Sequence, residues 1–438
     1  MNLLSPNIYL YSFYKQDAEY PEKSNPIWDR TQEILDYFTS NQNLKDKLDF
    51  SSPRVLLNSE EYLVFSTQLP NIKGFVQPLT IHDSYAIWLN IGCSENMQLI
   101  TQDISILPQL NPNQLLVFQE TQDIDKQSLF WGQTILISAY LEDQELPNKL
   151  KELATTYLKE LIGSELSCSH QGEFLSSFIF EYNSRTYHES SPHILVWLLN
   201  SKNTDSLFNK YQQKIINLLF YRHKIIKIFQ NSRKIYEELE KRYRIYKTEK
   251  IFEINDSQLQ NIQDKLQRIP KEALGYTYLL NGLKDSQNTI ETNLYNYKTI
   301  LKEIKAQDYR ENLEFWEDFS ENDCTFFSQQ ISADLNYYSP VIQLFDRAIA
   351  IIRGIVESEQ AQLDEKLENT IQAVGGGIAA GISAAGIVAT CYPLIEEPWG
   401  VISLRSLFHP FIASVGISVM VGIVAGLSVW WVIKKKPD

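Results

Sequence analysis

The fold class is decided by two stretches that contain no Asp, Glu, Lys or Arg: TIQAVGGGIAAGISAAGIVATCYPLI at residues 370–395 and SLFHPFIASVGISVMVGIVAGLSVWWVI at residues 406–433. A helix that crosses a bilayer needs about 20 mostly apolar residues, so each stretch is long enough. The sequence therefore predicts transmembrane helices at residues 371–395 and 408–433, joined by an external loop at residues 396–407.

The charges beside these stretches predict their orientation. The chain ends in a basic tail, residues 434–438, which contains Lys434, Lys435 and Lys436. Basic flanks stay on the cytoplasmic side, and two crossings return the chain to the side on which it started. Residues 1–20 lack the basic and apolar regions of a signal peptide. We therefore expect a multi-pass protein of the plasma (inner) membrane with the N- and C-termini in the cytoplasm.

Residues 1–205 have the pattern of a cytosolic domain of the α+β class. Aromatic and β-branched runs, typical of strands, alternate with two segments of helical spacing at residues 26–40 and 146–162. The runs expected to form strands are residues 7–14, 62–66, 85–91, 115–118, 134–139, 178–182 and 194–199.

Long helices are expected after this domain, at residues 206–310. From Tyr211 to Tyr246, apolar residues recur at alternating steps of four and three, and Arg222 and Ser232 interrupt the series. Such a heptad-like stripe indicates that one face of the helix packs against another helix. The sequence therefore predicts a pair of long antiparallel helices, a helical hairpin, in this region.

Two prolines are expected to interrupt the helical region, because proline lacks the N–H group of a helical hydrogen bond. Pro270, together with Gly275, should bend or divide the second long helix. Pro340 should break or kink the stalk helix predicted at residues 311–370. Beyond Pro340 no loop pattern precedes the first span, so the stalk is expected to continue into the membrane.

One face of the first predicted span is small or polar throughout. Lipid favours apolar side chains, so this strip should be turned away from the acyl chains. It either lines a water-filled pore built by several copies or packs closely against another helix, and the pairs Gly377/Gly381 and Gly422/Gly426 favour packing. The strip consists of Asn369, Gln372, Gly376, Ala379, Ser383, Gly386 and Thr390.

Two further features flank this strip. Gly375, Gly376 and Gly377 form a point of low helix propensity near the cytoplasmic entrance, which we interpret as a hinge. Glu396 and Glu397 follow the first span on the predicted outer side. They either attract cations to a pore mouth, as carboxylate rings do in cation channels, or belong to a solubilising loop.

The order of these parts resembles that of the CorA family of divalent-cation channels. Members of that family have a cytosolic α/β domain, long helices, a stalk helix continuous with the first span, a second span and a basic C-terminus. The corresponding parts are residues 1–205, residues 206–310, the stalk, the two spans and the basic tail. The resemblance implies a homopentamer whose first span surrounds a central pore, lined by the strip, with a divalent cation as the permeant ion.

The chain departs from this family at the end of the first span. The family's Gly-Met-Asn signature, which helps to hold a hydrated ion, is replaced by Thr390-Cys391-Tyr392-Pro393, and no Gly-x-Asn occurs between the spans. Magnesium selectivity is therefore not carried over from the resemblance. No carboxylates of a regulatory metal site can be assigned either.

Composition argues against several other classes. The formal net charge of −14 gives no support to nucleic-acid binding. Between Lys210 and Lys250, 12 Lys and Arg residues stand against 4 Glu, and this basic block either faces anionic lipid headgroups or is a solvated helix face. The cysteines are few and widely spaced, as is typical of reduced thiols.

Catalytic motifs are not recognisable in the sequence. It contains no Gly-rich phosphate loop, no G-x-S-x-G elbow and no H-E-x-x-H motif. Cys168-Ser169-His170 and the pair His188 and His193 are the densest Cys/His features, whereas zinc sites usually need four well-spaced ligands. We therefore predict that the protein is not an enzyme and holds no cofactor or resident metal.

Together the patterns favour an oligomeric, CorA-like channel or transporter for cations, gated by its cytosolic domain. Its expected partners are the lipid bilayer, further copies of itself and an unknown cytosolic ligand. One alternative is a membrane-tethered sensor or interaction protein whose spans are only anchors. Another is a defence effector that permeabilises the membrane when triggered.

Overall fold

The computed structural model describes residues 2–17, 21–39, 42–57, 61–93, 99–118, 129–141, 147–182, 192–201, 203–252, 259–306 and 312–358. The chain separates into two compact units. The first contains the described residues up to Asn231 and Ser286–Gln330, and the second contains those of Ser232–Asp285 and from Ile331 onwards. The predicted spans, external loop and basic tail lie outside the described residues.

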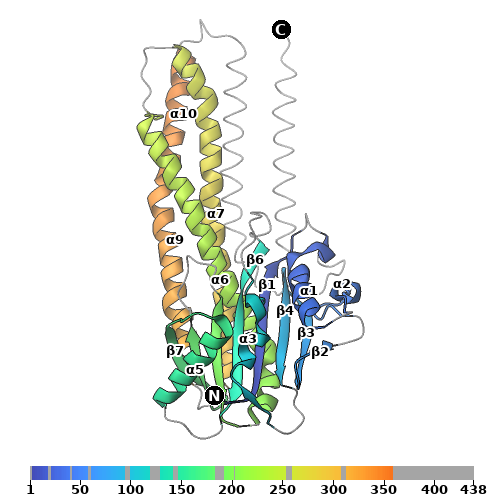
Figure 1. Ribbon diagram of the computed structural model, residues 1–438. Coiled ribbons are helices and arrows are strands. Elements are labelled where there is room, and N and C mark those ends of the chain that lie inside the picture. The colour runs from blue at the N-terminus through green and yellow to red at the C-terminus, as the bar shows by residue number, and fades with distance from the viewer. Residues whose placement is uncertain are drawn as a thin grey trace. The chain divides into compact units, whose positions relative to one another are not determined.

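The first unit is built on one mixed sheet with the strand order β2-β3-β4-β1-β6-β9-β8-β7, and β5 pairs with the start of β1 (Figure 1). Among the described strands, β6 and β9 run parallel, and the other neighbours are antiparallel. The strands are β1 (Asn2–Lys15), β2 (Leu63–Ser66), β3 (Ile72–Ile81), β4 (Ser84–Cys93), β5 (Thr101–Asp103), β6 (Phe130–Tyr140), β7 (Cys168–Phe174), β8 (Ser177–Tyr182) and β9 (His193–Leu199).

Short helices cover one face of this sheet (Figure 1). Because side chains alternate across a strand, Ile8 and Leu10 of β1 reach this face, where they share a core with Trp28. The first helix begins at Pro26, since the side chain of Asn25 accepts a hydrogen bond from the backbone N–H of Ile27 at 3.2 Å. The elements are η1 (Glu22–Ser24), α1 (Pro26–Phe38), α2 (Leu44–Lys47), α3 (Ile106–Leu110), η2 (Pro112–Gln114) and α5 (Pro147–Ile162).

The opposite face is covered by the first part of α6 (Asn203–Thr248). The ring of Phe208 lies 5.7 Å from that of Tyr9 on β1 and 5.0 Å from that of Trp197 on β9. Three turns further along α6, Phe220 lies 5.7 Å from Phe13. α6 therefore crosses the central strands, where its apolar side is buried.

The segment from residue 312 to the start of α9 packs against β7, the edge strand of the sheet, on the face that α6 covers. The backbone N–H of Glu173 on β7 donates to the carbonyl oxygen of Asn312 at 2.9 Å, and the Trp316 ring lies 5.7 Å from that of Phe174. A π-helical turn, η3 (Phe319–Asp323), separates α8 (Glu314–Asp318) from α9 (Cys324–Tyr338). Such turns are frequent at functional positions.

The second unit consists of helices in its described residues: the later part of α6, the earlier part of α7 (Leu259–Lys305), the end of α9, and α10 (Pro340–Ser358). Glu249 of α6 pairs with Arg268 of α7, Tyr246 donates to Glu272, and Ile235 lies beside Gly282. The two helices are therefore antiparallel, as the sequence predicts for a helical hairpin.

An aromatic core holds this unit together. The rings of Tyr246, Tyr276 and Phe345 lie 5.3–5.9 Å apart, so α6, α7 and α10 meet there. Arg233 of α6 forms an ion pair with the buried Asp334 of α9. Ser232, which interrupts the apolar stripe of α6, is fully buried beside this Arg.

The sequence-based strands are confirmed except for residues 115–118. There the chain forms turns, because side chains satisfy its backbone: Asn111 accepts from the N–H of Leu116, and Gln133 accepts from the N–H of Phe118. Three strands were not predicted, and one of them, β5, is only three residues long. Strand β3 contains Pro78, which is unusual inside a sheet, and β7 is mostly polar.

The effects of the two prolines differ. α7 remains one helix through Pro270, so the possible division at this residue is wrong. A turn at Ser339 separates α9 from α10, so the break predicted at Pro340 is confirmed. None of the helices in the described part of the chain has both the length and the apolar character needed for a membrane crossing.

Candidate functional site

Charged and polar side chains are buried between the sheet and α6 in the first unit. Glu181 of β8 is 3% exposed and is the centre of the cluster. Its carboxylate lies 2.8 Å from Nδ1 of His170 on β7, 2.8 Å from Nε2 of His193 on β9, and 3.5 Å from the guanidinium of Arg222 on α6. An ionised Glu181 therefore has a cation and two imidazoles around it.

A chain of hydrogen bonds extends from this carboxylate to a second buried histidine. Oγ1 of Thr134 on β6 lies 2.9 Å from Nδ1 of His193 and 2.8 Å from Nε2 of His223 on α6. With neutral imidazoles, His223 donates to Thr134, Thr134 donates to His193, and His193 donates to Glu181. Every group in this series then has a partner, which is the condition for burying a polar network without a large loss of stability.

Burial and charge determine which members of the cluster are ionised. Burial alone would raise the pKa of Glu181, but hydrogen bonds from the two imidazoles and the charge of Arg222 outweigh it and lower the pKa to about 2. Burial and Arg222 lower the pKa of His193 to about 4. The same causes, with His193, hold the pKa of His223 well below 6.5. At neutral pH the imidazoles of His193 and His223 are therefore uncharged.

The cluster connects the sheet with α6 and with the α8–η3 segment. The guanidinium carbon of Arg222 lies 5.0 Å from the centre of the Phe319 ring in η3, and Asp318 of α8 approaches His170 at 3.6 Å. Gly132 of β6 has a φ of +148° and directly faces the ring of His223. Strands β6 to β9, α6, and the α8–η3 segment thus meet at one buried ionic centre.

A hollow of about 350 Å³ lies on the face of the sheet that α6 covers, away from Glu181. Its floor is formed by the part of the sheet from β2 to β1, and Asn209 of α6 forms part of its wall. Its aromatic side includes Tyr62, Phe75 and Trp88, whose rings lie 4.6–5.8 Å apart. A volume of this size is at the lower end of the range for small-molecule pockets, about 300–1,000 Å³.

Polar groups are interspersed with the rings of this hollow. Nδ2 of Asn90 lies 3.3 Å from Oδ1 of Asn7, and both side chains line the hollow. The Asn7 side chain lies directly over Gly92, where any Cβ would collide with it. Lys73 is the one charged side chain among the lining residues that the structure describes.

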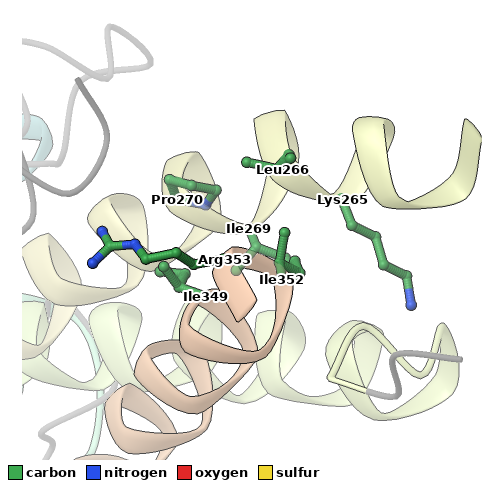
Figure 2. Close-up of a pocket in the computed structure, with 7 residues that line it drawn as sticks. All are labelled: Lys265, Leu266, Ile269, Pro270, Ile349, Ile352 and Arg353. Atoms are coloured by element: carbon green, nitrogen blue, oxygen red, sulfur yellow. The ribbon is translucent and has the colours of Figure 1, made fainter. Parts of the chain in front are cut away.

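A second, smaller hollow lies between α7 and α10 in the other unit. Figure 2 shows Ile349, Ile352 and Arg353 of α10 beside Leu266, Ile269 and Pro270 of α7. The space is about 10 Å³, which is close to the room that a single water requires. We interpret it as a packing defect where Pro270 removes the hydrogen bond to the carbonyl of Leu266.

The site residues that the sequence predicts all lie outside the described residues. These are the strip from Asn369 to Thr390, the glycine hinge, and the acidic pair Glu396 and Glu397. Within the described part, no three His, Cys, Asp or Glu side chains are placed to hold a metal ion. The basic block is partly internal, because Arg222 pairs with Glu181 and the buried Lys224 pairs with Asp83 at 2.7 Å.

The ionic cluster and the hollow of the first unit were both missed from the sequence, although the cluster left a signal. Glu181 is the acidic residue of an otherwise apolar strand, and Arg222 interrupts the stripe of α6. A charged residue at a position that should be buried indicates a buried partner. No protein-family model, curated protein or solved structure matches this chain, so its function is inferred from these side chains and from the sequence.

Proposed function

We propose that the protein is an oligomeric, CorA-like channel or transporter for cations in the plasma (inner) membrane, regulated by its α/β unit. The observation that carries this proposal is the strip of small and polar residues within an uncharged, membrane-length stretch at residues 370–395. Polar side chains of a membrane helix are turned away from lipid, toward another helix or toward water. A water-filled pore between several copies of the protein would give the strip such a polar environment.

An exposed apolar stripe on α9 and α10 supports self-association. Tyr337, Leu344 and Ile351 follow one another at steps of seven residues and are 65%, 37% and 50% exposed. The residues immediately after them, Tyr338, Phe345 and Ile352, are buried in the unit. One side of this helical segment is thus used within the chain, while the other has the heptad spacing of a helix-to-helix contact.

A membrane-tethered sensor is the second candidate. Thr390-Cys391-Tyr392-Pro393 stands where the CorA family has its ion-holding signature. In this alternative the spans anchor the protein, and the strip packs against a neighbouring helix. An effector that depolarises the membrane on a trigger differs from the channel in its biological use, and the same flux measurement detects it.

Flux through liposomes containing the full-length protein tests conduction. Ser383→Leu and Gly376→Leu each place a bulky apolar side chain on the strip, and we expect either to reduce cation flux by about tenfold or more, since a hydrophobic constriction closes a pore by dewetting. Ile378→Leu exchanges one apolar residue of the same span that lies outside the strip; it is the matched control and should conduct normally. Unchanged flux in both strip variants would exclude the strip as the conducting path.

Self-association through the stripe predicts a change of mass. Leu344→Glu combined with Ile351→Glu places charges at the centre of the contact, and we expect the oligomer measured by light scattering in detergent to dissociate into smaller species. Gln343→Glu adds a charge beside the stripe and should leave the mass unchanged. An unaltered mass for the double variant would show that these residues do not join the copies.

A further inference from the structure

Three buried polar atoms without a partner belong to residues that line the 350 Å³ hollow of the first unit or lie next to its lining. Nε1 of Trp88, Oη of Tyr11 and Nε2 of Gln212 have no hydrogen-bond partner in the described part of the chain, and their residues are 5%, 0% and 6% exposed. An unpaired buried polar atom destabilises the folded chain. Each such atom in a native protein therefore requires an explanation.

These three residues belong to one neighbourhood. Tyr11 pairs directly with Trp88 across β1 and β4, and it follows Tyr9, which lines the hollow, by two residues on the same face of β1. Gln212 follows Asn209, another lining residue, by about one turn of α6. Trp88 lines the hollow itself, whereas Tyr11 and Gln212 lie behind its lining.

The remaining lining groups define the chemistry of a ligand. Tyr62, Phe75 and Trp88 provide aromatic surface, on which planar rings stack. Asn7, Asn90 and Asn209 provide amides that both donate and accept hydrogen bonds. Register places Lys73 opposite Gly92, on the same side of the sheet as Trp88, and its ammonium is a binding group for phosphate.

We propose that this hollow is a binding site for a mononucleotide, a planar base that carries hydrogen-bonding edges and one phosphate. The base would stack on the aromatic rings and bond to the asparagines. The phosphate would lie at the rim beside Lys73, which is exposed. No acidic side chain lines the hollow among the described residues, and the carboxylate beside it, that of Glu61, is hydrogen-bonded to the Tyr62 hydroxyl. The proposal goes beyond conduction and does not depend on it.

Calorimetric titration of the full-length protein in detergent with AMP, GMP, CMP, UMP, their four nucleosides and inorganic phosphate tests the site. We expect at least one nucleotide to bind with a Kd below about 1 mM, and its nucleoside and phosphate alone to bind at least about tenfold more weakly. Trp88→Leu removes the aromatic ring on which the base would stack, and should weaken binding about tenfold.

Charge and position are tested by a pair of lysine variants. Lys73→Gln should weaken nucleotide binding by about tenfold or more and leave nucleoside binding unchanged. Lys23→Gln, which changes an exposed lysine of η1, should have no effect. The proposal is overturned if none of the four nucleotides binds, if phosphate alone binds as well as a nucleotide, or if binding is the same in Trp88→Leu and Lys73→Gln as in the unaltered protein. Normal binding in a protein that conducts no ions would leave this site standing and remove only the channel.

Discussion

Replacing Glu181 by Gln is expected to destabilise the α/β unit by about 3–5 kcal/mol, because it leaves the guanidinium of Arg222 buried without its counter-charge. Arg222 and Glu181 are each 3% exposed. The amide would also turn an N–H group toward an imidazole N–H, since His170 and His193 both lie 2.8 Å from the carboxylate. Chemical unfolding of the full-length protein in detergent, followed by tryptophan fluorescence, measures the change.

A double variant separates the ion pair from the packing around it. Glu181→Gln with Arg222→Met removes both charges, and we expect it to be clearly more stable than Glu181→Gln alone, because no buried charge is left unpaired. Glu165→Gln breaks an ion pair with Lys159 whose side chains are both mostly exposed, and it should cost less than about 1 kcal/mol. Equal losses for the single and the double variant would show that the pairing of charges does not determine the stability.

Acid is expected to destabilise the same unit between pH 6.5 and pH 4. Burial and Arg222 lower the pKa of His193 from 6.5 to about 4 in the folded protein. Between these values the unfolded chain binds a proton that the folded chain does not, so stability is fully present above pH 6.5 and falls as the pH decreases. At pH 5 the loss from His193 is about 2 kcal/mol.

Two neighbours add to this dependence. The pKa of His223 is held well below 6.5 by burial, Arg222 and His193, so it acts in the same direction. Burial alone would raise the pKa of Glu181, but its two imidazole partners and Arg222 lower it to about 2, so its stabilisation is present above pH 4.5 and is lost as the pH falls toward 2. The free energy of unfolding measured at pH 7, 6 and 5 checks the slope.

The histidine origin of this slope can be tested with one substitution. His193→Gln removes a titrating group while keeping a polar side chain, and we expect a flatter dependence of unfolding free energy on pH than in the unaltered protein, whatever its stability at pH 7. Glu165→Gln should retain the original slope. If His193→Gln and the unaltered protein lose stability equally between pH 7 and pH 5, His193 is not the group that responds to acid.

The sequence was sufficient to predict those strands and helices that follow from a local pattern of apolar residues. Strands β1, β4, β6, β8 and β9 are apolar runs buried on both sides of the sheet, and such runs are recognisable without their partners. The long helices and the break at Pro340 also follow from local periodicity and from the missing N–H group of proline. The uncharged stretches at residues 370–395 and 406–433, and the strip within the first, are likewise properties of the sequence alone.

Tertiary structure alone decided which distant residues meet. Glu181 and Arg222 are separated by 41 positions, and their pairing depends on where α6 crosses β8. The hollow depends on register, because Tyr11 opposes Trp88, and Lys73 opposes Gly92, only in the observed alignment of β1, β3 and β4. A shift of one residue would turn each of these side chains to the other face of the sheet. A local pattern shows that a residue is buried. The residue that it pairs with comes from a segment distant in the sequence, so only the tertiary structure identifies it.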